Sequence, residues 1–224
     1  TNMKIAVMSD IGRTVSEELL PASESVVDMV RIATYIHQIP AAIELIEDAH
    51  AKGYETTVNI MAISKSSGDE LDEVLELLAA TPVDVIYIAD SFGSFYPEQI
   101  KKLSAKYVKV ARGAKKPKLV GIHAHNNIQL AFANTIEAII QNVNYLDGTI
   151  FGIGRAAGNC PLELLLGFLK NPKYDLRPIL DILETHFVKL NEEIEWGYTV
   201  PYMITGILDL HPRAAMKLRK TEKK

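Results

Sequence analysis

The chain has 224 residues, of which 48% are hydrophobic and 23% charged, a composition typical of a globular protein with one sizeable core. Its net charge of −4 excludes a general electrostatic attraction to nucleic acid or to anionic membranes, so we expect a small soluble substrate and no nucleic-acid or membrane partner. A single cysteine, Cys160, excludes an internal disulfide framework and favours a cytoplasmic location, and no apolar run is long enough to span a membrane.

Short β-branched runs alternate with stretches of helical periodicity along the first two thirds of the chain. The runs predict strands at residues 4–8, 27–33, 56–62, 83–89, 118–123 and 145–151. Helices are predicted between them at residues 15–20, 39–52, 69–81, 97–111 and 127–142. Residues 175–211 predict two or three further helices without a strand. We therefore divide the chain into a barrel portion, 1–170, and a C-terminal helical extension, 171–224, packed on it.

The strands are too continuously apolar for a sheet with one solvent-exposed face. Such continuous apolar runs are typical of parallel strands in α/β proteins, which are buried on both faces. Six βα units fit either an open doubly wound sheet or a (β/α)₈ barrel. No Gly-x-Gly-x-x-Gly opens the first helix, so the usual dinucleotide fingerprint is missing. Polar residues instead follow several strands, as a barrel site requires: Asn59, Asp90, Ser91, His123 and His125. These observations favour a TIM (β/α)₈ barrel.

Two histidines, His123 and His125, end the fifth predicted strand at positions i and i+2. Alternate residues of a strand point to the same face, so both imidazoles should project together. Imidazole is the commonest protein ligand of transition metals, and a pair leaves positions open for water and substrate. The alternative is two core or surface histidines without a ligand.

Two segments, one with two histidines and one rich in glycine, carry a resemblance to a known family: Gly121-Ile-His-Ala-His-Asn-Asn-Ile-Gln-Leu-Ala131 and Asp147-Gly-Thr-Ile-Phe-Gly-Ile-Gly-Arg-Ala-Ala-Gly-Asn159. Together with Ile88-Ala-Asp-Ser-Phe-Gly93, they resemble the metal-dependent aldolases and acyl-CoA lyases related to 4-hydroxy-2-oxovalerate aldolase and HMG-CoA lyase. That superfamily also includes isopropylmalate synthase. The resemblance covers nearly the whole chain.

The resemblance implies a lyase that cleaves a 4-hydroxy-2-oxo acid to pyruvate and an aldehyde. It implies a divalent metal, Mn²⁺, Mg²⁺ or Zn²⁺, held by His123, His125 and Asn159. The alternatives are a Claisen-type acyltransferase resembling isopropylmalate synthase, and an inactive or partial barrel that acts as an assembly module. No residue stands out as the general base.

Further site residues come with structural alternatives. Asp90 and Ser91 occupy the family's substrate side, but an Asp cap and a turn serine explain them equally. Arg155, in a glycine-rich loop, would hold a carboxylate or phosphate of the substrate, unless the loop is only a turn. Tyr202 is similar to a C-terminal tyrosine that the pyruvate aldolases bring over the site, a catalytic role to which packing is the alternative.

The chain departs from the family at its beginning. The family's first strand carries a Thr-Leu-Arg-Asp-Gly type of motif, with a ligand aspartate and an arginine, and residues 4–12 instead match the third strand. A barrel of this type needs about 250 residues, so we expect an intact homologue to have roughly 70 to 90 more at its N-terminus. Six strands would leave an open barrel with two unpaired edges, and we expect a homo-oligomer. A short form without catalysis, or a barrel completed by another chain, stays open.

Overall fold

The computed structural model describes residues 3–14 and 16–222, and the chain forms two compact units. The first unit comprises Thr1–Ala89, Lys101–Ile122 and Gln141–Tyr145. The second comprises Asp90–Ile100, His123–Ile140 and Leu146–Lys224. The boundary predicted between residues 170 and 171 is a different division and stays a prediction. No described helix is both long enough and apolar enough to cross a membrane.

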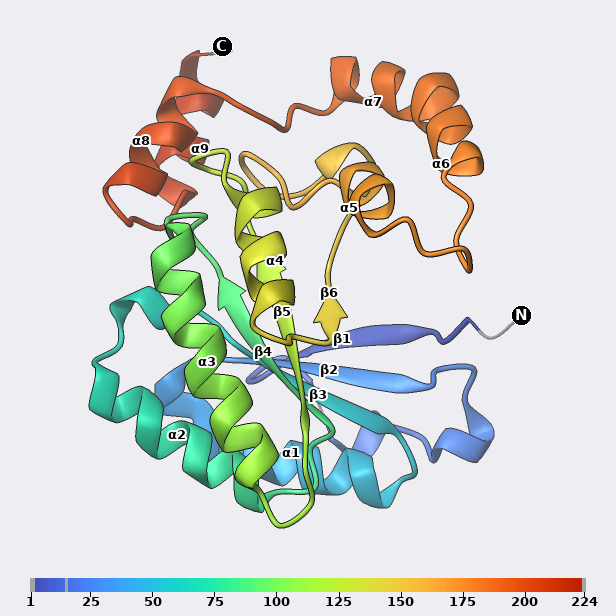
Figure 1. Ribbon diagram of the computed structural model, residues 1–224, viewed down its shortest axis with the longest axis vertical. Coiled ribbons are helices and arrows are strands. Elements are labelled where there is room, and N and C mark those ends of the chain that lie inside the picture. The colour runs from blue at the N-terminus through green and yellow to red at the C-terminus, as the bar shows by residue number, and fades with distance from the viewer. Residues whose placement is uncertain (1–2, 15, 223–224) are drawn as a thin grey trace. The chain divides into compact units, whose positions relative to one another are not determined.

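The central sheet has six strands in sequence order, and its first four pair in parallel (Figure 1). They are β1 (Ala6–Asp10), β2 (Met29–Thr34), β3 (Glu55–Ile60), β4 (Val85–Asp90), β5 (Leu119–Ala124) and β6 (Tyr145–Leu146). Met29 of β2 stands opposite Ala6 of β1 and Glu55 of β3, which sets the register. Within the described chain, β1 and β6 are the two ends of this order, so the sheet is open, as expected for six βα units.

The first unit is built from β-strands and amphipathic helices. It contains α1 (Ile39–Ala51), α2 (Gly68–Ala80) and most of α3 (Pro97–Gly113). The buried residues of α1 recur every three or four positions: Ile39, Ala42, Leu45, Ile46 and Ala49. Consecutive residues of β3 and β4 are buried, including Val58, Ile60, Ile86 and Ile88. Burial of both strand faces confirms the prediction of parallel, internal strands.

The second unit starts at the last residue of β4 and the last two residues of β5. Its helices are α4 (Ala131–Ile140), α5 (Leu162–Leu169), α6 (Arg177–Ile182), α7 (Val188–Glu193), α8 (Val200–Ile207) and α9 (Arg213–Glu222). A π-helical turn, Leu183–Phe187, joins α6 to α7, so this region is helical as predicted.

Three predicted elements differ from the structure. The first helix, at residues 15–20, is replaced by the short 3₁₀ turns Ser16–Glu18 and Ala22–Glu24, while Val15 lies outside the described residues. Six residues before Pro21 are too few to offset the cost of starting an α-helix.

The helix predicted from residue 127 begins only at Ala131. Gln129 has a φ of +61°, which no α-helix accommodates, and the Asn126 side-chain oxygen accepts the Ala131 N–H at 3.1 Å. The sixth strand ends at Leu146 rather than 151, and the end of the predicted strand is instead the 3₁₀ turn Ile150–Gly152, in which Phe151 has a φ of +54°.

Candidate metal centre

His123 and His125 lie at the carboxyl end of β5 and belong to the second unit. Their ring centroids are 5.1 Å apart, with the rings nearly perpendicular at 86°. The two imidazoles therefore lie side by side, as the i and i+2 spacing predicted.

Asp147 holds the ring of His123. Its Oδ2 atom is 2.9 Å from Nδ1 of His123, and both side chains are largely shielded from solvent. A carboxylate accepts the proton on Nδ1, which leaves Nε2 as the basic nitrogen of His123. The sequence analysis assigned Asp147 no role, because the strand predicted at 145–151 placed it within a strand, whereas β6 ends at Leu146 and Asp147 follows it directly.

His125 is fixed by the glycine-rich loop that follows β6. Its Nδ1 atom is 3.3 Å from the carbonyl oxygen of Gly158, and its backbone forms an antiparallel bridge with Asn159. The Asn126 N–H donates to Gly158 and the Cys160 N–H to Ala124. These backbone bonds bring Asn159 opposite His125, a contact between residues 34 positions apart that the resemblance predicted only as a shared ligand role.

Asn159 presents one side-chain oxygen without a described partner. Its Nδ2 atom donates to the carbonyl of Ile153 at 3.1 Å, whereas the buried Oδ1 atom accepts no hydrogen bond. A buried acceptor without a donor is unfavourable unless a cation or a water satisfies it. Gly154 allows this position, because a Cβ atom there would lie 2.6 Å from Asn159 Nδ2.

The protonation state of His125 fits a metal ligand. Burial, followed by the neighbouring His123 and Arg155, lowers the pKa of His125 to about 3, so the ring is neutral at physiological pH. Two imidazole nitrogens and one amide oxygen would form a mixed N/O donor set, of a kind that Mn²⁺, Mg²⁺ or Zn²⁺ could occupy. Over the described residues no group of three His, Cys, Asp or Glu side chains that could hold a metal ion comes together, and the ligand roles of His123, His125 and Asn159 stay a prediction.

Asp90 is the last residue of β4 and is almost completely buried. Its two carboxylate oxygens accept the backbone N–H groups of Ser94, at 3.0 Å, and Phe95, at 3.3 Å. Burial raises the pKa of Asp90 to about 6, although these hydrogen bonds oppose the shift. The contacts match the structural alternative, a capped loop before α3, and the substrate-side role of Asp90 stays a prediction.

Arg155 and Ser91 meet through the Arg155 guanidinium, which donates to the Ser91 carbonyl at 3.1 Å. Tyr202 of α8 is buried against Ala156 and Ala157, the two residues after Arg155, and against Ala215. The guanidinium carbon of Arg219 lies 5.5 Å from the centre of the Tyr202 ring. Tyr202 therefore packs beside the glycine-rich loop, and its catalytic role remains a prediction.

His211 is a further residue of this region that sequence reasoning missed. Its ring centroid is 5.6 Å from that of Phe92, two residues beyond the end of β4. Burial, then the charges of Arg155 and Arg213, lower the pKa of His211. No periodicity or motif marks His211 in the sequence, because it lies between α8 and α9 and joins the site only through the tertiary fold.

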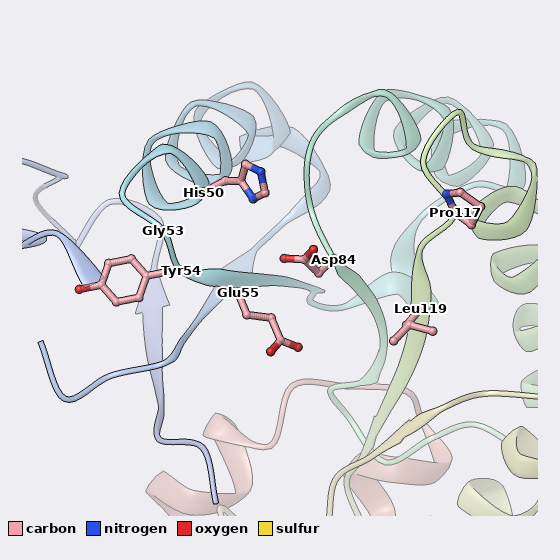
Figure 2. Close-up of a pocket in the computed structure, with 7 residues that line it drawn as sticks. All are labelled: His50, Gly53, Tyr54, Glu55, Asp84, Pro117 and Leu119. Carbon is pink, nitrogen blue, oxygen red and sulfur yellow. The ribbon is translucent and has the colours of Figure 1, made fainter. Parts of the chain in front are cut away.

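A pocket of about 470 Å³ lies at the amino ends of strands of the first unit (Figure 2). Its two carboxylates have partners. Asp84 accepts the Thr56 N–H at 2.9 Å, and Glu55 accepts the Tyr145 hydroxyl at 2.8 Å and forms an ion pair with Lys4. Barrel enzymes place their chemistry at the carboxyl ends of the strands, so we assign this pocket a structural role.

Comparison with known proteins points to one family. The HMGL-like family model matches residues 10–188. The 4-hydroxy-2-oxovalerate aldolase of Thermus thermophilus is 34% identical over 185 residues, which are 81% of this chain and 52% of that protein. The oxaloacetate decarboxylase of Mycobacterium tuberculosis is 34% identical over 143 residues, which are 64% of this chain and 41% of that protein. The chain thus spans about half the length of the curated relatives it matches.

A solved structure extends the match to the fold. The N-terminal domain of a candidate aldolase from Bacteroides vulgatus superposes with a TM-score of 0.78 at 29% identity, over 97% of this chain and 73% of that one. With the open six-stranded sheet, this match confirms the predicted fold class, a partial barrel of the aldolase type.

Proposed function

Because the chain belongs to the HMGL-like family, we propose that it is a metal-dependent carbon–carbon lyase of the aldolase type. The proposed reaction cleaves a 4-hydroxy-2-oxo acid to pyruvate and an aldehyde. The relatives named aldolase and oxaloacetate decarboxylase support it, because both names describe cleavage of a bond to C3 of a 2-oxo acid. Since the chain spans about half of these relatives, the activity of the whole protein is part of the proposal.

The observation that carries the proposal is the arrangement of His123, His125 and the unpaired Oδ1 atom of Asn159. These residues would hold a Mn²⁺, Mg²⁺ or Zn²⁺ ion. When bound, such an ion acts as a Lewis acid that stabilises the negative charge of an enolate.

The chain's own residues orient the ligands and the substrate. Asp147 and the Gly158 carbonyl contact the Nδ1 atoms of the two histidines, which would leave their Nε2 atoms to act as ligands. In the cleavage, the 4-hydroxyl loses its proton, the C3–C4 bond breaks to release the aldehyde, and C3 takes up a proton to give pyruvate. We propose Tyr202 as a residue that faces this chemistry and Asp90, Ser91 and Arg155 as substrate contacts.

The remaining predictions of the sequence extend the proposal. A cytoplasmic location rests on the single, buried Cys160. A homo-oligomer and a helical extension from residue 171 are proposed with it.

The test measures metal binding and products separately. Purified protein with Mn²⁺, Mg²⁺ or Zn²⁺ should release pyruvate from 4-hydroxy-2-oxovalerate. A coupled dehydrogenase assay measures the pyruvate that is released. Release of free CoA from acetyl-CoA and a 2-oxo acid, without pyruvate formation, would instead identify the Claisen-type acyltransferase. His123→Ala should abolish stoichiometric metal binding in calorimetry, and unchanged metal content in this variant would remove the metal site.

A further inference from the structure

A pocket of about 260 Å³ lies in the second unit, among Arg155, His211, Arg213, Met216 and Lys217. Three of these side chains are permanently positive at neutral pH, and no carboxylate is among the residues that line it. In a chain whose net charge is −4, such a concentration of positive charge creates a local field that attracts anions.

The positive charges come from two segments. Arg155 belongs to the glycine-rich loop, whereas Arg213 and Lys217 are four residues apart on α9 and so lie on the same face of that helix. Like charges at this spacing destabilise a helix. The acidic Glu195 pairs with Arg219, outside the pocket, and Asp209 accepts a hydrogen bond from Ser94 at 2.7 Å. An anion in the pocket would relieve the repulsion between Arg213 and Lys217.

His211 is oriented to donate a hydrogen bond even without a positive charge. The Arg213 N–H donates to its Nδ1 atom at 3.0 Å, so Nδ1 is an acceptor and the proton of the neutral ring is on Nε2. Two guanidinium groups, an ammonium group and an imidazole N–H therefore surround one cavity, a donor set that matches the several acceptor oxygens of a carboxylate or phosphate.

The pocket adjoins the histidine pair through shared segments. Arg155 is three residues from Gly158, whose carbonyl contacts His125, and its guanidinium reaches the Ser91 carbonyl just beyond β4. The His211 ring packs against Phe92 of that same segment. The positive pocket and the histidine pair are therefore built from the same segments of the second unit.

We propose that this pocket binds a second anionic group of the substrate, a carboxylate or phosphate at the end that becomes the aldehyde. This inference rests on the proposed function and names its substrate class. The substrate is a 4-hydroxy-2-oxo acid with a distal anionic group, and its cleavage yields pyruvate and an anionic aldehyde. Neither the 2-oxo group nor the C1 carboxylate needs these cations if a metal holds them.

The first experiment tests the pocket without metal and without turnover. Inorganic phosphate and succinate are titrated calorimetrically into the full chain and into the double variant Arg213→Gln/Lys217→Met. We expect at least one of the two anions to bind and its affinity to fall at least about tenfold in this variant, since each lost partner is a charged hydrogen-bond donor. Which anion binds more tightly distinguishes phosphate from carboxylate recognition.

A matched control removes the same charge elsewhere. The double variant Lys170→Gln/Lys189→Gln loses two exposed cations of the same unit and should keep the affinity of the parent chain. If neither anion binds, or if both double variants weaken binding equally, the pocket is not an anion site.

The second experiment links the pocket to the substrate. In the presence of Mn²⁺, a 2-oxo dicarboxylate such as 2-oxoadipate should bind at least about tenfold more tightly than pyruvate, and Arg213→Gln/Lys217→Met should remove this advantage. Equal affinities in the parent chain would overturn the substrate assignment. A chain that binds the anion in the pocket but cleaves no 2-oxo acid would instead contradict the proposed function alone.

Discussion

Asp147 and His123 are the residue pair on which the proposed metal centre depends most directly. Their contact at 2.9 Å joins residues 24 positions apart and sets which imidazole nitrogen of His123 is basic. The histidine spacing alone predicted two side chains on one face but left their orientation open.

Asp147→Asn keeps the shape of the side chain but removes its charge. We expect the affinity for Mn²⁺ or Zn²⁺ to fall about 10- to 100-fold, because carboxylates that hold a ligand histidine contribute on this scale. Isothermal titration calorimetry measures the metal affinity, and Asp181→Asn, at an exposed aspartate, is the control. Equal affinities in the two variants would show that Asp147 does not orient a metal ligand.

Gly154→Ala tests Asn159 without changing it. The new Cβ atom would lie 2.6 Å from Asn159 Nδ2 and 3.0 Å from Oδ1, so the side-chain amide must move from its position beside Gly154. We expect weaker metal binding with both histidines intact. An unchanged metal affinity together with a displaced amide in a crystal structure would exclude Asn159 from the donor set.

At the scale of elements, the helix starts predicted at residues 39, 69 and 97 lie within one residue of the observed starts of α1, α2 and α3. Ser67 and Glu70 form a reciprocal capping box at the start of α2: the Glu70 N–H donates to the Ser67 hydroxyl at 3.2 Å, and the Ser67 N–H donates to the Glu70 carboxylate at 2.8 Å. The helix expected from residue 127 had no such box, and Gln129 in the left-handed region delays its start to Ala131.

Ser67→Ala removes the cap and should lower the free energy of unfolding by about 1 kcal/mol. Chemical denaturation measures the change, and Ser66→Ala, at the adjacent position outside the box, should have a much smaller effect. If the two variants are equally stable, the box contributes nothing to α2.

The capping box also predicts a pH dependence. Hydrogen bonds from the Ser67 backbone and side chain lower the pKa of Glu70, so the stability that this carboxylate contributes is present above its ordinary pKa and is lost as the pH falls. The stability difference between the parent chain and Glu70→Gln should therefore shrink between pH 7 and about pH 3. A difference that stays constant over this range would contradict the role of the carboxylate.

At the scale of the whole molecule, the open sheet dominates the expected behaviour. Within the described chain β1 ends the strand order, and it exposes the apolar side chains of Val7 and Met8, which are 39% and 57% accessible. An apolar edge strand is a template for pairing with another chain. We therefore expect a protein of these 224 residues to self-associate through β1.

Val7→Lys/Met8→Lys should lower the average mass measured by light scattering, because charges on an edge strand oppose pairing. The control Leu20→Lys/Val26→Lys adds the same charge at two exposed apolar positions outside the strands. Association that responds equally to both double variants would result from general repulsion rather than from β1.

The sequence by itself determined the order of the strands and of the helices after residue 39, the parallel sheet and the position of the histidine pair at the end of β5. These features follow from local periodicity, β-branched runs and capping residues, whose effects extend over a few neighbours. Only the tertiary structure decided that Asp147 holds His123, that Asn159 lies opposite His125 and that His211 and α9 join Arg155 around one pocket. Such contacts depend on the close packing of distant segments, which no local pattern of residues encodes.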